Sequence, residues 1–185
     1  MDNGESSYRR YLQGDDHAFS LLVDACYDPL VLFINSYVHD LNFAEDIAED
    51  TFVRLAVKKP RFDNRSSFKT WLYSIARKVM TDKIRKAARH KTASLDECAE
   101  PTAEDDDIER NYIKKERDIA LHRAMLQLKP EYRAILWLFY FEDMKTENIA
   151  KSIGKSADAA EHLLRRARQA LKQILDKEGF DYEGT

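Results

Sequence analysis

The chain of 185 residues is poor in residues that interrupt helices, since it contains only five glycines and four prolines. No stretch keeps the apolar–polar alternation of a half-buried strand, and apolar residues recur about every 3.6 positions along most of the chain. This length has room for two small domains, and 44% hydrophobic residues can supply a modest core. We therefore expect an all-α protein of two small helical domains.

Cysteine is also scarce. Cys26 lies on an apolar stripe and Cys98 in a polar stretch, with no CxxC motif and no nearby set of histidines. This usage predicts free thiols, with no disulfide and no metal site. The five histidines are scattered, and no nucleophile–base set or phosphate-binding loop accompanies them. The sequence therefore predicts neither an enzyme nor a bound cofactor.

Long apolar runs are missing as well. The longest, Ile135 to Phe141, is far shorter than the roughly 20 residues that a membrane-spanning helix needs. The first residues, MDNGESS, are polar and do not match a signal peptide. We expect a cytoplasmic protein with no membrane insertion.

The most informative segment runs from Asn64 to Lys91 and is strongly basic. It has nine lysines and arginines and a single acid, a net +8 in a chain whose total is −3. Such a charge concentration is typical of a nucleic-acid-binding surface. The residues expected to face the core at helical spacing are Phe68, Leu72, Ile75 and Val79. Those expected to face solvent are Tyr73, Arg77, Lys78, Arg85 and Arg89.

Two interpretations of this basic helix stay open on its own residues. Aromatic faces beside cations suit unstacked bases and phosphates. A solvated basic helix in which Trp71 and Tyr73 simply pack would have the same composition.

Three helices are expected before the basic segment. Asp16 is predicted to cap the first, and Asp28 with Pro29 to begin a second. The third, after Asn42, carries an acidic outer face of Glu45, Asp46, Glu49 and Asp50. Two pairs of these acids are four residues apart and should repel by roughly 0.2–0.5 kcal/mol each. The dipole at a helix N-terminus or a basic protein partner could offset the repulsion, and the two explanations are compatible.

The composition changes abruptly after Lys91. Residues 92–111 contain eight acids, one base and Pro101, a net −7, with almost no large apolar side chains. This pattern predicts an extended acidic linker. We expect a first domain at 8–91, the linker at 92–111 and a second domain at 112–176.

The second domain is predicted to end in a helix-turn-helix. Pro130 separates two helices; Thr146 is expected to cap a short helix, Gly154 to end it, and Ser156 to cap the next. Ordinary helical hairpins also turn at glycine, but the arginines of the last helix favour DNA binding. Its outer or flanking surface carries His162, Arg165, Arg166, Arg168 and Gln169.

In this order, the segments resemble the extracytoplasmic-function (ECF) class of bacterial sigma factors in the sigma-70 family. The resemblance runs from about Gly14 to Leu175 and is carried by GDDHAF, AEDIAEDTF, FKTWLYSIARKVMTDKIR, LKPEYRAILWLFYFEDM, NIAKSIGKS and RRARQAL. It implies a promoter-specificity subunit that binds core RNA polymerase, opens DNA at the minus-10 element with its first domain and reads the minus-35 element with its second.

The resemblance also implies roles for particular residues. The polymerase-binding set is Glu45, Asp46, Glu49 and Asp50, opposite the β′ clamp helices, while the β flap is a further polymerase contact. The loop at 62–67 would hold a flipped base. The minus-10 set is Phe62, Asn64, Arg65, Ser67, Trp71, Tyr73, Arg77, Lys78, Arg85, Lys86 and Arg89. The minus-35 set is Lys155, Ser156, His162, Arg165, Arg166 and Arg168. An anti-sigma factor is a further partner in this class, and the linker would thread toward the RNA exit path.

The chain departs from the family pattern at several positions. The family commonly has Thr-Val-Lys-Ser-Arg where residues 159–163 read Ala-Ala-Glu-His-Leu, so its contacts do not transfer to Ala159, Glu161 or Leu163. Lys78 stands where asparagine is usual, and Asn148 where glutamate is usual. These changes bear on the promoter sequence more than on the role.

Two other interpretations compete with a sigma factor. A stand-alone transcription regulator would bind duplex DNA through the helix-turn-helix without being a polymerase subunit. A purely helical adaptor would bind protein only. The regulator would leave the basic aromatic helix and the acidic face unexplained, and only a sigma factor requires a stable complex with core polymerase.

Overall fold

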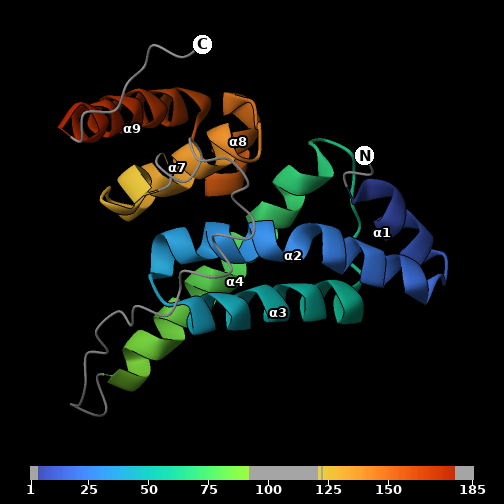
Figure 1. Ribbon diagram of the computed structural model, residues 1–185. Helices are drawn as coiled ribbons and strands as arrows, with labels where there is room; N and C mark the ends of the chain where they lie inside the picture. The colour runs from blue at the N-terminus through green and yellow to red at the C-terminus, as the bar shows by residue number, and fades with distance from the viewer. Residues whose placement is uncertain (1–3, 92–120, 122, 178–185) are drawn as a thin grey trace.

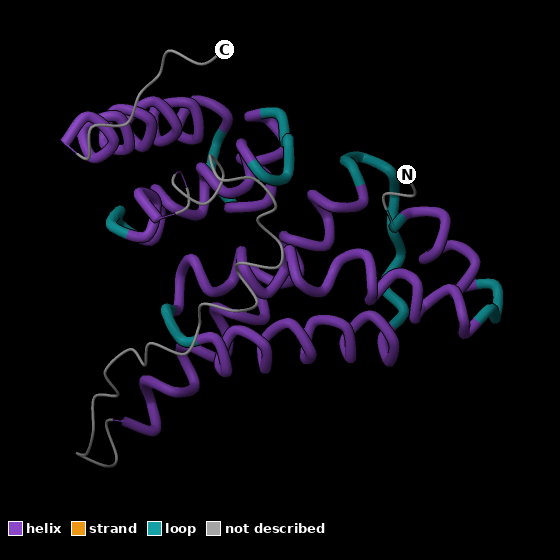
Figure 2. The backbone as a smooth tube through the Cα atoms, viewed as in Figure 1, coloured by secondary structure: helices purple, strands orange, loops and turns teal. Residues whose placement is uncertain are grey.

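The computed structural model describes residues 4–91, 121 and 123–177. Every regular element in these ranges is an α-helix, which confirms the expected all-α class (Figure 2). The predicted acidic linker and Cys98 lie outside the described residues. The helices of the first domain are α1 (Glu5–Leu12), α2 (Asp16–Val38), α3 (Leu41–Lys58) and α4 (Phe68–Lys91). Those of the second are α7 (Pro130–Tyr140), α8 (Thr146–Ile153) and α9 (Ala157–Lys177).

The helix α2 is longer than the sequence predicts. Pro29 was expected to begin a new helix, but it lies inside one continuous helix of 23 residues. The prediction was wrong because Pro29 is itself buried and Leu30 to Ser36 are all buried behind it, so packing outweighs the lost N–H bond. By length and composition alone, α2 also passes as a membrane-crossing helix, the one such helix in the described ranges, and 44% of its apolar window is buried inside the protein.

The helix caps of the first domain are shifted from their predicted positions. Asp15, not Asp16, caps α2, since its Oδ1 accepts from the N–H of Ala18 at 3.2 Å. Asp40 caps α3 in the same way through the N–H of Phe43 at 2.9 Å, so α3 begins before Asn42. Each aspartate satisfies a backbone donor that the helix leaves open.

Helix α1, which was not predicted from the sequence, closes the first domain. Its two tyrosines reach the end of α3: the Tyr8 hydroxyl donates to the Pro60 carbonyl at 2.8 Å, and the Tyr11 hydroxyl to Ala56 at 3.0 Å. Burial, with a smaller effect of Tyr11, raises the pKa of Tyr8 to about 12, so the phenol stays protonated as a donor. The Tyr8 ring also packs 5.5 Å from Phe68 at the start of α4.

The helix-turn-helix of the second domain is confirmed. Pro130 begins α7, Gly154 ends α8 with φ of 67°, and the Ser156 Oγ accepts from the N–H of Ala159 at 3.2 Å at the start of α9. Thr146 is the first residue of α8 and not its cap, which is Lys145 without a side-chain bond. Ala160, Leu164, Ala167 and Leu171 form the buried stripe of α9, as their spacing predicts.

The two domains pack directly against each other. Figure 1 shows α7, α8 and α9 on the side of α2 that faces away from α3. The contacts are made by α7 on α2 and by α8 on α4. The N-terminal half of α4 is therefore covered by both domains.

Gly154 provides a test of the turn and of this contact together. Alanine is strained at positive φ, and a Cβ at 154 would collide with the Arg77 guanidinium, whereas a Cβ at Gly14, also at positive φ, would meet nothing within 4 Å. We expect Gly154→Ala to destabilise the protein by more than about 1 kcal/mol. Thermal unfolding of Gly154→Ala, with Gly14→Ala as control, measures it. If the unfolding temperature falls equally in the two variants, or if adding Arg77→Ala does not restore any stability to Gly154→Ala, the contact is contradicted.

Candidate nucleic-acid and protein interfaces

The acidic face of α3 is largely open to solvent. Asp46, Glu49 and Asp50 are exposed, and Glu45 is half-buried. The Lys83 ammonium of α4 lies 2.9 Å from an Asp50 oxygen and donates to the Asp46 backbone carbonyl at 3.0 Å. Lys83 therefore partly neutralises the C-terminal end of the acidic face. The carboxylates of Asp46 and Glu49 are its most accessible negative charges.

A fifth acid, Asp28 of α2, joins this cluster. Burial raises the pKa of the Tyr27 phenol, and the charges of Glu45, Glu49, Asp28 and Asp46 raise it further. Sequence reasoning missed Asp28 as a member because it is on another helix. The combined negative potential favours a basic partner.

An apolar ridge lies beside the acidic face. Val53 and Val57 of α3 are 57% and 76% exposed and border a hollow of about 600 Å³ between α3 and α4. Lys83 and Lys86 of α4 also line it. The sequence analysis did not identify these valines, although two β-branched residues four apart, off the buried stripe, were the available signal. Exposed apolar side chains next to charges are typical of protein-binding surfaces.

The aromatic residues of α4 are mostly used in packing. Tyr73 was expected to face solvent, but it is only 2% exposed and meets the Phe33 ring edge-on, with 4.7 Å between the ring centroids. The prediction was wrong because α4 is buried on a wider face than its apolar stripe indicates. Trp71 is half-buried, 5.3 Å from Phe62 and 5.4 Å from Tyr8.

The loop before α4 has its own internal order. The Ser67 Oγ accepts from the N–H of Thr70 at 3.2 Å and lies 2.7 Å from the Thr70 hydroxyl, so Ser67 caps α4. Asn64 has φ of 59° at the bend. The Arg65 side chain is 86% exposed, 3.2 Å from the Asp63 carboxylate. The loop thus exposes Asn64 and Arg65 beside the half-buried ring of Phe62.

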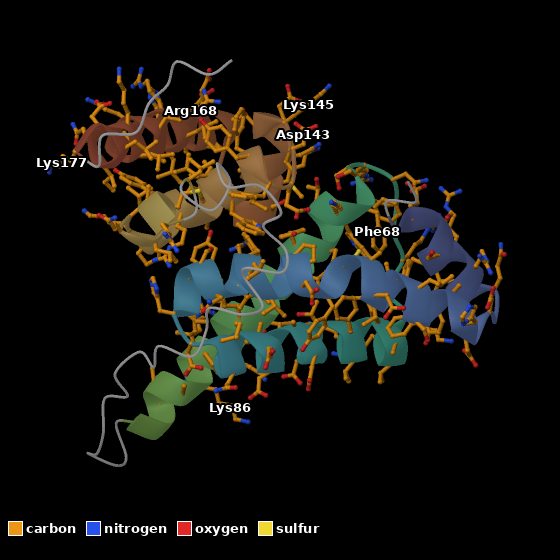
Figure 3. All side chains as sticks on the ribbon, in the orientation of Figure 1. Phe68, Lys86, Asp143, Lys145, Arg168 and Lys177 are labelled. Carbon is orange, nitrogen blue, oxygen red and sulfur yellow. The ribbon has the colours of Figure 1, made fainter. Side chains whose placement is uncertain are left out.

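The exposed cations of α4 lie toward its C-terminal half. Lys78, Arg85, Lys86 and Arg89 are exposed, and Figure 3 shows Lys86 far along the helix from Phe68. Arg77 is different, because it is half-buried and points at Gly154 of the second domain. Of the five minus-10 cations predicted on α4, the structure therefore brings four to one open stretch of the helix.

The helix α9 exposes all the minus-35 cations that are predicted on it. His162 Nδ1 and Arg165 Nη2 are 2.9 Å apart, and the Arg168 guanidinium stacks 4.2 Å from the Phe139 ring of α7. A hollow of about 640 Å³ is lined by the side chains of His162, Arg165, Arg168 and Phe139. Figure 3 labels Arg168 on α9. Phe139, which was not among the predicted site residues, orients Arg168 by a cation–π contact. Lys155 lies 3.8 Å from Glu131, and Arg166 is exposed.

Within the described residues, no group of three histidine, cysteine or acidic side chains is placed to hold a metal ion. Cys26 is a buried free thiol, as expected.

Comparison with protein families gives two matches in chain order. Residues 22–90 match the model of Sigma-70 region 2, and residues 118–171 match the model of Sigma-70, region 4. The first match contains the acidic face and α4, and the second contains the helix-turn-helix.

Curated relatives extend over most of the chain. It is 28% identical to the RNA polymerase sigma factor YlaC of Bacillus subtilis over 152 residues, 82% of this chain and 88% of that protein. It is 27% identical to the ECF RNA polymerase sigma factor SigW of the same organism over 171 residues, 88% and 91% of the two chains. The RNA polymerase sigma-H factor of Pseudomonas aeruginosa is 28% identical over 188 residues, 95% of each chain.

Two solved structures share the fold. CnrH, in complex with the cytosolic domain of CnrY, matches with a TM-score of 0.62 at 24% identity, covering 95% of this chain and 99% of CnrH. The sigma factor RpoE of Bartonella quintana, in complex with the anti-sigma factor NepR, matches with a TM-score of 0.61 at 22% identity, covering 85% and 96%.

Proposed function

The chain belongs to the sigma-70 family of RNA polymerase sigma factors, in its ECF class, and on that premise we propose which of its surfaces bind polymerase and which bind promoter DNA. As a sigma factor it binds core RNA polymerase and promoter DNA and directs transcription initiation. The observation that carries this is the pair of family matches in the order region 2, region 4. Its relatives are initiation factors and not enzymes, and we assign the chain no catalysis.

The first domain, 8–91, acts as region 2, and α1 extends it to residue 5. Its acidic face binds the β′ clamp helices, with Asp46 and Glu49 contributing most because Lys83 already occupies Asp50. The ridge of Val53 and Val57 adds apolar area beside the charges. Charge complementarity of this kind mainly sets the rate and specificity of association.

The minus-10 surface combines the loop at 62–67 with the exposed cations of α4. A base leaving the duplex needs a stacking surface, and the half-buried rings of Phe62 and Trp71 are the aromatics nearest the loop. Lys78, Arg85, Lys86 and Arg89 bind the phosphates. Tyr73 supports this surface from the core and does not stack on a base.

The second domain, 112–176, acts as region 4, contacting the minus-35 element and the β flap. Ser156 and Lys155 stand at the start of α9, where helix N-termini favour phosphate. The side chains of His162 and Arg165 are within hydrogen-bond distance of each other, so they form one polar surface toward the DNA. Arg166 and Arg168 supply mainly phosphate contacts.

A stand-alone regulator remains the alternative that the helix-turn-helix alone would allow. A regulator of this kind would not need region 2, whereas a sigma factor uses both matched regions. We further propose a cytoplasmic location. An anti-sigma factor is proposed as a partner, since the structural relative RpoE was solved with one.

The acidic face is tested by charge reversal. Asp46→Lys with Glu49→Lys should weaken binding to core polymerase roughly tenfold at low salt and less at high salt, because screening reduces charge attraction. Copurification and affinity with core enzyme measure this. The matched control is Asp24→Lys, which reverses an exposed acid of α2. If the double variant binds core enzyme as tightly as the control does, the face has another role.

The minus-10 surface is tested by removing its open cations. Lys78→Ala with Arg85→Ala should keep core binding but lower open-complex formation, since two phosphate contacts to the melted strand are lost. Permanganate reactivity of promoter thymines reports melting. Lys59→Ala, at the end of α3, removes a cation elsewhere and is the control. Unchanged thymine reactivity in the double variant would contradict the assignment.

The recognition helix is tested with the holoenzyme on a library of minus-35 sequences at two salt concentrations. Arg166→Ala should lower affinity for many sequences together and reduce the salt dependence, because phosphate contacts do not discriminate sequence. His162→Ala should change the preference at one position, by roughly 1–3 kcal/mol for a base-edge contact. Gln169→Ala is the neutral control. If Arg166→Ala does not change the affinity at either salt concentration, or if His162→Ala leaves the minus-35 preference unchanged, α9 uses other residues.

A further inference from the structure

Helix α9, the second helix of the helix-turn-helix, carries two acids ahead of its arginines. Asp158 lies in its first turn and Glu161 in its second. DNA phosphates repel a carboxylate, so an exposed acid on a helix that binds DNA needs its own explanation. We propose that Glu161 and His162 select G·C base pairs in the minus-35 element: Glu161 accepts a hydrogen bond from cytosine, and His162 donates one to guanine. The inference rests on the proposed function, in which α9 contacts that element.

The helix itself accounts for Asp158 but not for Glu161. The helix dipole favours an acid in the first turn, and its effect has faded where Glu161 stands. An ion pair with Arg165, four residues later, would be a second explanation. Among the described residues, however, the Glu161 carboxylate makes no ion pair or hydrogen bond, and Arg165 contacts His162 instead. The Glu161 carboxylate is therefore available to DNA.

The contact with Arg165 determines which group His162 can offer to a base. His162 Nδ1 and Arg165 Nη2 are 2.9 Å apart. A guanidinium has only donors, so the ring nitrogen that faces it accepts the hydrogen bond and has no proton. In a neutral imidazole the proton is then on Nε2, which is left as a donor. An ionised carboxylate has only acceptors, so Glu161 and His162 offer DNA opposite kinds of group.

Both side chains lie where a helix of this kind meets bases. In a helix-turn-helix, the N-terminal residues of the second helix contact the edges of bases in the major groove. Glu161 and His162 are the fifth and sixth residues of α9, and both are exposed. Both also border the hollow of about 640 Å³, together with Thr146 at the start of α8. An acceptor and a donor thus stand side by side at an open surface near the start of the helix.

The major-groove edges of the bases decide which partners fit this pair. Cytosine presents an amino donor at N4 and no acceptor, whereas guanine presents two acceptors, N7 and O6. Adenine also has an amino group, but its N7 acceptor lies beside that group and repels a carboxylate oxygen. Glu161 therefore favours cytosine and also disfavours the other three bases. The Nε2–H of His162 fits the two acceptors of guanine.

A carboxylate that only tuned the charge of α9 would behave differently from one that contacts a base. Removing such a charge would strengthen binding to every sequence by the same factor, since phosphate contacts do not discriminate between sequences. Removing a base contact changes the preference at one position and leaves the others as they were. The two roles of Glu161 can therefore be separated by measuring many sequences at once.

The test measures binding of the holoenzyme to a library of minus-35 sequences. The parent should prefer cytosine at one position by about fivefold or more. Glu161→Ala should lose this preference, chiefly by binding the other bases more tightly, and alanine keeps the helix intact. Glu161→Gln should shift the preference toward adenine, because an amide matches both N6 and N7. His162→Ala should lose a preference for guanine.

Glu147→Ala is the matched control, because it removes an exposed carboxylate from the neighbouring helix α8. This control should change the affinity for all sequences by one factor. If Glu161→Ala does the same, or if Glu161→Gln keeps the preference for cytosine, Glu161 does not contact a base and the inference is overturned. A preference for guanine that survives His162→Ala overturns the role of His162. If the parent holoenzyme itself has no minus-35 preference, the function proposed for the second domain fails together with the inference.

Discussion

One constraint determines much of this structure: the helix α4 is buried on two sides and also carries the largest positive charge of the chain. Its apolar stripe packs on α2 and α3, and its first turns are covered again by α8. The surface left for the proposed contacts with nucleic acid is the loop before the helix and the cations of its second half. A helix used in this way has little aromatic surface to expose, which is why Tyr73 packs in the core and Trp71 is half-buried.

Local signals predicted much of the local structure, although the predicted caps Asp16 and Thr146 are each the first residue of their helix. Pro130, Gly154 and Ser156 act on the backbone within one or two turns, and each stands where its conformational preference and hydrogen bonding require. The apolar stripe of α9 follows directly from helical spacing. The acidic face of α3 likewise could be predicted, since its residues follow one another along the chain.

Features that depend on distant contacts could not be read in the same way. Pro29 would end a helix in isolation, but burial on both sides of it continues α2. Tyr73 lies next to the stripe, and only the packing of Phe33 from another helix decides that it is buried. The contribution of Asp28 to the acidic cluster and of Phe139 to Arg168 arises in the same manner, from neighbours far apart in sequence.

The proline inside α2 has a consequence for how the first domain moves. Without an N–H, Pro29 leaves the helix one bond short near its middle, and the two halves on either side have different partners. The first half meets α1, where Phe19 packs 4.6 Å from Tyr11, while the end of the second half meets α7 through His39. The missing bond makes the middle of α2 its locally weaker point, where hydrogen exchange should be fastest within the helix. On either side of this point the helix is held by a different neighbour, α1 on the first half and α7 on the second, so the two halves can differ in local stability.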